Sequence, residues 1–136
     1  MKKAHEAAWD RCKIQLMMKG SVFITTVAFS LRIHWTSTHT STACTDGKNL
    51  WLNTDWIMGL TEGQRVGLYA HEIWHVCFRH MERQPHLDGE VWNDAGDHLI
   101  NLMLLKEGYE LPPNGLWEPR FKGMSTLEIY DILIKE

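Results

Sequence analysis

The fold predicted for this 136-residue chain is decided by one stretch, residues 61–75, which reads TEGQRVGLYAHEIWH. Thr61 and Gln64 have the spacing of a capping box, in which each side chain accepts a hydrogen bond from the other residue's backbone N–H. We therefore predict a helix that begins after Thr61 and continues to about Met81. The helix cannot extend past Gln84, because the residue before a proline is forced out of helical geometry.

The middle of this predicted helix carries His71-Glu72-Ile73-Trp74-His75, a His-Glu-x-x-His pattern. Residues four apart point to nearly the same side of a helix, about 40° apart. Two imidazoles in that arrangement can reach one Zn²⁺ at about 2.0–2.1 Å. Glu72 lies about 60° further round the helix, where its carboxylate can take a proton from a water activated by the metal. The pattern predicts a catalytic zinc site.

A catalytic zinc site needs a third protein ligand, and the next predicted helix offers candidates. Asn93, Asp97 and Asn101 follow one another at steps of four and share one face of it. Asparagine is a poor helix former, so this stripe is an unusual choice for a face that is only solvated. We predict Asp97, at the centre of the stripe, as the third ligand. Asp94 and His98 remain as alternatives.

Two other residues near the pattern have two interpretations each. In a continuous helix His80 lies about 180° from His71, so we predict a core or supporting role for it and not a ligand. Gly67 lies one turn before His71, and a glycine inside a helix costs about 1 kcal/mol relative to alanine. It indicates either close packing against another segment or room for metal or substrate.

The remaining sequence predicts a single α+β domain over residues 1–136. Residues 22–29 fit either a strand or a buried helix, and the three prolines of residues 111–123 indicate a loop, either plain surface or a lid over the site. The other predicted elements are a helix over residues 3–18, a strand over 31–36, a hairpin of 41–45 and 48–53 around Asp46-Gly47, a helix over 89–106, and a last helix after Ser125.

Composition excludes several classes of function. Lys and Arg total 14 against 17 Asp and Glu, so there is no basic surplus for binding nucleic acid. No apolar run approaches the roughly 20 residues of a membrane span, and the N-terminus lacks the apolar core of a signal peptide. The three cysteines are far apart and form no Cys-x-x-Cys pair, which favours reduced thiols. We expect a cytoplasmic protein.

The chain also resembles a known family, the zincin-like metallopeptidase domains usually found N-terminal to a von Willebrand factor A-like domain. The resemblance covers about residues 22–133 and rests on the His-Glu-x-x-His pattern and on a second motif that includes Trp92, Asn93, Ala95, Asp97, Ile100 and Asn101. It implies zinc ligands His71, His75 and Asp97, Glu72 as the general base, and a small mixed sheet with a hairpin beside the active-site helix. No A-like domain follows in this sequence, so what that domain supplies is expected to be absent or to come from a separate partner.

The function predicted from these observations is a zinc-dependent metallopeptidase acting on a protein or peptide substrate. The strand over residues 48–53, taken as a sheet edge, would bind the substrate by strand addition. Tyr109, His98 and Arg79 are candidate donors to the oxyanion. A zinc amidase acting on a non-peptide amide and a non-catalytic zinc-containing interaction module are the alternatives. Glu72 counts against the second, since a structural zinc site does not use such a carboxylate.

Overall fold

The computed structural model describes residues 2–136, and within them helix α4 (Glu62–Cys77) carries the His-Glu-x-x-His pattern. The predicted capping box is confirmed: Thr61 Oγ1 accepts from the backbone N–H of Gln64, and Gln64 Oε1 accepts from that of Thr61. The buried face of the helix includes Tyr69 and Ile73, which lie in the main hydrophobic core. The cap therefore sets where the helix begins, and the apolar face sets which side points inward.

The predicted α+β class is confirmed by the elements around α4. Helices precede and follow a short three-stranded sheet. The other elements are α1 (Ala4–Lys19), α2 (Val22–Ser30), β1 (Arg32–Thr36), β2 (Ala43–Thr45), β3 (Asn49–Asn53), α3 (Thr54–Met58), α5 (Gly89–Lys106), the 3₁₀ turn η1 (Pro119–Phe121) and α6 (Thr126–Leu133).

The ambiguous stretch after residue 21 forms helix α2. Ser21 Oγ accepts a hydrogen bond from the backbone N–H of Ile24 and caps the helix. Ile24 and Ala28 are buried against the rest of the core. Capping and tertiary packing outweigh the strand preference of the β-branched residues here. Helix α3, which was not predicted, begins in the same way at Asn53, whose Oδ1 accepts from Trp56 N.

The sheet is mixed and has the strand order β1-β3-β2. β1 pairs with β3 in parallel, and β2 pairs with β3 as the predicted antiparallel hairpin. Asp46 Oδ1 accepts from the backbone N–H groups of Lys48 and Asn49, and Gly47 has a φ of 96° that favours glycine. The prediction that residues 48–53 form an edge is wrong. β3 is the central strand, with Leu50 and Leu52 fully buried. The two edge strands are β1 and β2.

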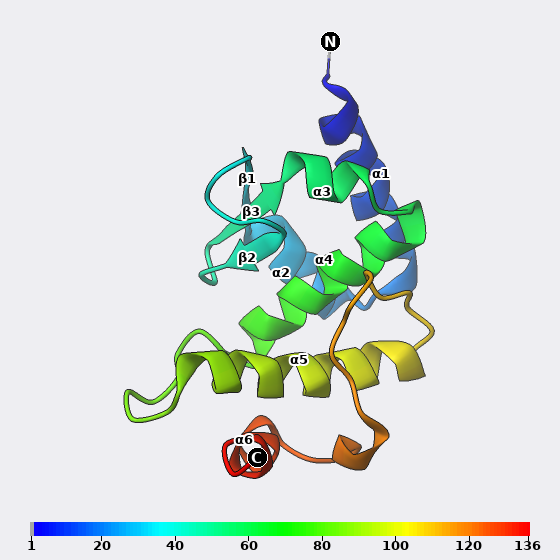
Figure 1. Cartoon of the computed structure of the whole chain (residues 1–136). Helices are drawn as coiled ribbons and strands as arrows, with labels where there is room; N and C mark the ends of the chain where they lie inside the picture. The colour runs from blue at the N-terminus through cyan, green and yellow to red at the C-terminus, as the bar shows by residue number, and fades with distance from the viewer. Residues whose placement is uncertain (1) are drawn as a thin grey trace.

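The helices are arranged in layers around α4. Figure 1 shows α4 between the small sheet and α5, and α6 on the opposite side of α5. One core cluster joins α1, α2, β3 and α4, and a second lies between α5 and α6. Among residues 2–136, no helix combines the length and apolar character needed to cross a membrane.

Helix α4 ends earlier than predicted, at Cys77 instead of near Met81. The backbone N–H of Arg79 donates to Val76 O at 3.0 Å, and that of His80 donates to His75 O at 3.1 Å. With Arg79 at a φ of 57°, these two bonds form a Schellman motif, which reverses the chain at a helix C-terminus. The motif folds His80 back over His75. The assumption of a continuous helix, which placed His80 far from the metal side, is therefore wrong.

The space beside Gly67 is filled by the backbone of Glu110. A Cβ added at Gly67 would lie 1.7 Å from the carbonyl oxygen of Glu110, so only glycine allows this approach. Of the two interpretations of Gly67, close packing is the one that the structure supports. The contact fixes the start of the segment that follows α5, which Figure 1 shows crossing back past α4 and α5.

Candidate metal centre

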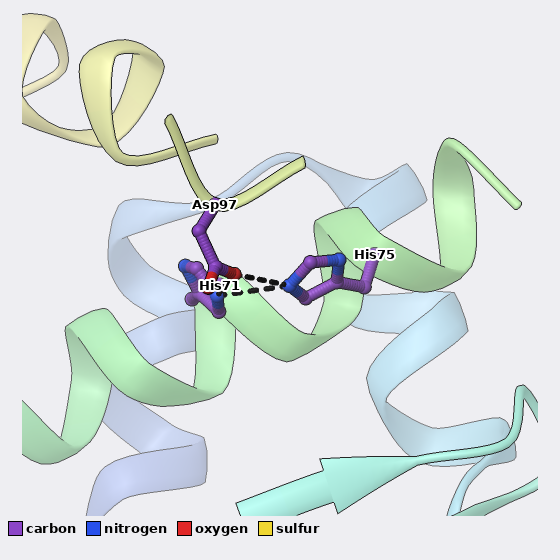
Figure 2. Close-up of side chains that lie close together, drawn as sticks. All are labelled: His71, His75 and Asp97. Carbon is purple, nitrogen blue, oxygen red and sulfur yellow. Dashed lines mark hydrogen bonds and ion pairs between the residues drawn. The ribbon is translucent and has the colours of Figure 1, made fainter. Parts of the chain in front are cut away.

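Three side chains from two helices converge on one point. His71 and His75 project from successive turns of α4, and Asp97 projects from the facing side of α5 (Figure 2). Asp97 Oδ1 lies 3.0 Å from His71 Nε2 and 3.0 Å from His75 Nε2, and the two Nε2 atoms are 2.9 Å apart. Among the described residues, these are the His, Cys, Asp and Glu side chains grouped closely enough to share a metal ion.

The chemistry of this donor set fits a metal ion. His71 Nδ1 donates to Asn101 Oδ1 at 2.8 Å, because an amide oxygen can only accept. In the neutral ring, Nε2 of His71 then carries a lone pair that faces Asp97 Oδ1. Ligand atoms at about 2.0–2.1 Å from a tetrahedral zinc lie about 3.3–3.4 Å apart. The three atoms here would need to separate by only a few tenths of an ångström.

The charges in the cluster are strongly coupled. Burial by itself would raise the pKa of Asp97, but hydrogen bonds and charge from His71 and His75 lower it well below its usual range. Burial by itself would lower the pKa of His71, yet the hydrogen bond with Asp97 and the charge of Glu72 raise it overall. The Asp97 carboxylate thus stays ionised beside the two imidazoles, and its negative charge favours a cation where the three side chains converge.

Glu72 lies beside the cluster, in the same cleft. Its side chain is buried, with 7% of the residue exposed, and it lines the cleft together with His71 and His75. The cleft has a volume of about 510 Å³ and is open to solvent. Asp97 is 31% exposed at its side chain, so the point of convergence is reachable from outside. A buried carboxylate next to an accessible metal site has the placement of a general base.

The cleft has two walls besides the helices. On one side lies edge strand β2 with the preceding Thr42, and on the other lies the segment of residues 112–116. Asn101 Nδ2 donates to Leu116 O at 2.8 Å, so the side chain that holds His71 also holds this segment. The sequence offered only a choice between plain surface loop and lid here. The structure shows a cleft wall fixed at both ends, by Gly67 and by Asn101.

His75 has its own partner, which is His80. The two Nδ1 atoms lie 2.9 Å apart, and His80 Nε2 lies 2.8 Å from Thr126 Oγ1 on α6. His80 is 4% exposed. Burial, reinforced by the charge of His75, lowers the pKa of His80 to about 4, so this ring is neutral near pH 7. The predicted core or supporting role of His80 agrees with this position. The prediction assumed a continuous helix, however, whereas α4 ends at Cys77.

The alternative ligands and the proposed oxyanion donors lie elsewhere. Asp94 and His98 are outside the three-residue cluster, and His98 packs its ring against Phe121 with centroids 4.9 Å apart. None of the three candidate oxyanion donors lines the cleft. Tyr109 is buried under Lys19, and Arg79 forms an ion pair with Glu82 on the surface. These residues were candidates by side-chain type alone, and the structure places them outside the residues that line the cleft.

Sequence reasoning also missed how the histidines are held. Asn101 was recognised as part of a polar stripe, but its partner His71 is 30 residues away and no local pattern pairs them. The steps of four between Asp97 and Asn101, set against the step of four between His71 and His75, were the available signal. The two sets pair in opposite order along the chain, His71 with Asn101 and His75 with Asp97.

The fold and this donor set define a small α+β domain in which a cleft between two helices carries side chains that could hold a metal ion. The chain belongs to the family described as "Putative metallopeptidase domain", whose model matches residues 5–133. Neither a curated protein nor a solved structure matches the chain. The family assignment agrees with the predicted resemblance and covers nearly the whole sequence.

Proposed function

We propose that the protein is a zinc-dependent metallopeptidase in which His71, His75 and Asp97 hold the metal and Glu72 is the general base. The observation that carries the proposal is the convergence of three lone-pair atoms, 2.9–3.0 Å apart, beside a buried carboxylate in an open cleft. When bound, zinc would lower the pKa of a coordinated water toward about 7 and polarise the substrate carbonyl.

Two imidazoles and one carboxylate suit either zinc or iron(II), so the donor set alone does not choose the metal. Glu72 favours zinc hydrolysis. Its position next to His71 on α4 brings a second carboxylate into the same cleft, and redox chemistry does not require one. Hydrolysis does require a group that moves a proton.

Glu72 would act twice in each reaction. It first accepts a proton from the attacking water as the water oxygen bonds to the carbonyl carbon of the substrate. It then donates this proton to the amide nitrogen as the carbon–nitrogen bond breaks, so the carboxylate is regenerated. Only 7% of Glu72 is exposed, and the residue lines the cleft, so few water molecules compete with the substrate for its proton.

A peptide substrate would lie along β2. This strand is at the edge of the sheet, lines the cleft and faces α4. An extended peptide can pair with its free edge through backbone hydrogen bonds that do not depend on side chains. The exposed Asn93, one helical turn before Asp97, also lines the cleft. We assign its amide as a donor to the substrate carbonyl, in place of the three predicted residues that lie outside the cleft.

The proposal is tested by comparing wild-type protein with Glu72→Gln on a mixed peptide library, with bound zinc measured in the same samples. We expect about one zinc per chain in both proteins and a loss of hydrolysis of roughly 10²–10⁴-fold in the variant. Glu62→Gln is the matched control, because Glu62 is exposed in the first turn of the same helix.

Three results would contradict the proposal. They are wild-type protein that binds no zinc, wild-type protein that binds zinc but cleaves no peptide, and a Glu72→Gln variant as active as Glu62→Gln. Cleavage of small amides in place of peptides, with the same dependence on Glu72, would assign the site to the amidase alternative.

A further inference from the structure

The ring of His80 is held by three segments of the chain: the C-terminal end of α4, helix α5 and the first residue of α6. Its ring stacks on Phe78 with centroids 5.4 Å apart, and Trp92 meets it edge-on at 5.7 Å. Trp92 Nε1 also donates to the backbone oxygen of His80. At Gly96 an added Cβ would lie 2.7 Å from His80 Nδ1, so α5 has no side chain at the point of contact. The orientation of this ring is therefore fixed from several sides.

The fixed ring joins His75 to helix α6. His80 Nδ1 lies 2.9 Å from His75 Nδ1, and His80 Nε2 lies 2.8 Å from Thr126 Oγ1, the first residue of α6. Both contacts are short enough for hydrogen bonds. The nitrogen of His75 that faces away from the point of convergence is thus the one bonded to His80, while Nε2 faces Asp97.

The donors and acceptors along this chain can be assigned once His75 Nε2 holds a metal. Nε2 then presents its lone pair, so the ring hydrogen of the neutral His75 is on Nδ1. Two nitrogens in hydrogen-bond contact share one hydrogen, so His80 Nδ1 must accept. The hydrogen of the neutral His80 ring is then on Nε2 and is donated to Thr126 Oγ1. The direction of every bond follows from the first.

We propose that His80 and Thr126 are positioning residues for the metal centre, which hold His75 in the tautomer and orientation that bind the metal through Nε2. This inference rests on the proposed metal centre. It adds that the N-terminus of α6, 51 positions after His75 in the sequence, sets the metal affinity. Partners of this kind, which contact ligands without touching the metal, typically change affinity by about 10–100-fold.

The experiment compares Thr126→Val with Thr126→Ser in the full chain. Valine has nearly the shape of threonine and lacks the hydroxyl, whereas serine keeps it. The zinc dissociation constant is measured by competition with a chelator, and the thermal midpoint of the metal-free proteins is measured alongside. We expect Thr126→Val to bind zinc about 10–100-fold more weakly and Thr126→Ser to remain within about threefold of wild type.

A second pair tests His80 directly. His80→Asn can place an amide oxygen where Nδ1 accepts, and His80→Leu cannot accept at all. We expect zinc affinity to be kept better by the asparagine variant. In the zinc-loaded wild-type protein, nitrogen-15 spectra of the histidine rings should show the hydrogen of His80 on Nε2 and that of His75 on Nδ1.

The outcomes separate this inference from the proposed function. Wild-type protein without zinc affinity removes the metal centre and this inference together. Tight zinc binding by wild type and by Thr126→Val alike, or equal losses in Thr126→Val and Thr126→Ser, overturns this inference alone. A hydrogen on Nδ1 of His80 in the zinc-loaded protein also overturns it, whatever the affinities are.

Discussion

Asp97 supplies the negative charge of the proposed metal centre, and its replacement by asparagine tests that role at a single residue. Asp97→Asn keeps the size of the side chain but removes the charge that both histidines stabilise. We expect zinc affinity to fall by more than about 100-fold, beyond the range for residues that only support a ligand. The measurement is a competition titration with a chelator.

The matched control is Asp94→Asn on the same helix. Asp94 carries the same charge and lies outside the cluster, so its replacement should change zinc affinity only a few-fold. An equal loss in both variants would mean that the general negative charge of α5, and not ligation by Asp97, attracts the metal.

For individual residues, the sequence predicts the three that cluster but not the residues that hold them. His71, His75 and Asp97 follow from helical spacing, because four residues make nearly one turn. The roles of Asn101 and His80 depend on contacts between distant segments. No spacing rule contains such contacts.

The C-terminus of α4 is the element that brings His80 to His75, and Arg79 occupies the position where such motifs usually have glycine. A left-handed conformation costs a non-glycine residue about 1–2 kcal/mol. Replacement by glycine removes this cost, but part of the gain is lost because glycine makes the unfolded chain more flexible. We expect Arg79→Gly to leave the free energy of unfolding unchanged or raise it by up to about 1 kcal/mol. The ion pair with Glu82 is exposed and contributes little.

Arg79→Val is the opposing variant, since a β-branched residue is strongly disfavoured at positive φ. Urea unfolding of both variants measures the difference, with Arg79→Val the less stable. If Arg79→Gly destabilised the protein as much as Arg79→Val, the Schellman motif would not be what ends the helix.

The close approach of Glu110 to α4 gives a second prediction for an element. Gly67→Ala places a Cβ 1.7 Å from a backbone oxygen, so the segment leading to the cleft wall must move. We expect a loss of about 1–3 kcal/mol in the free energy of unfolding, as in other overpacked cores. Urea unfolding measures the loss.

Gly63→Ala is the control one turn earlier on the same helix. Its Cβ would meet only the carboxylate end of Glu110, a flexible group that can swing away. With the better helix propensity of alanine, this variant should be neutral or slightly stabilised. Equal stability of Gly67→Ala and wild type would contradict the close packing.

The elements themselves were predictable where a local signal exists. The Thr61–Gln64 capping box and the Asp46-Gly47 hairpin are confirmed because each depends on a few neighbouring residues. Strand order depends on which surfaces meet in space, so β3 was wrongly placed at an edge. The end of α4 was missed because arginine at position 79 gives no sign of a left-handed residue.

For the whole molecule, the shifted pKa values of His71, His80 and Asp97 predict how the stability of the metal-free protein depends on pH. The raised pKa of His71 stabilises the fold fully below pH 6.5, and this contribution is lost as pH rises through the raised value. The pKa of His80, lowered to about 4, acts in the other direction: the unfolded chain binds a proton below pH 6.5 that the folded protein excludes. Stability therefore falls between pH 6.5 and 4.

The lowered pKa of Asp97 extends the loss below pH 3.8. We expect a maximum of stability near pH 6.5, measured as the urea midpoint from pH 4 to 9 in the presence of a chelator. His80→Asn should flatten the acid side of this profile. A metal-free profile that rises from pH 6.5 to 8 would contradict the assigned directions.

Crystals of the zinc-loaded protein test the proposed metal centre, because anomalous diffraction at the zinc absorption edge locates the metal. We predict one zinc per chain at about 2.0–2.2 Å from His71 Nε2, His75 Nε2 and Asp97 Oδ1, with an open position toward Glu72. Zinc bound elsewhere, or bound through Nδ1 of either histidine, would contradict the proposed metal centre.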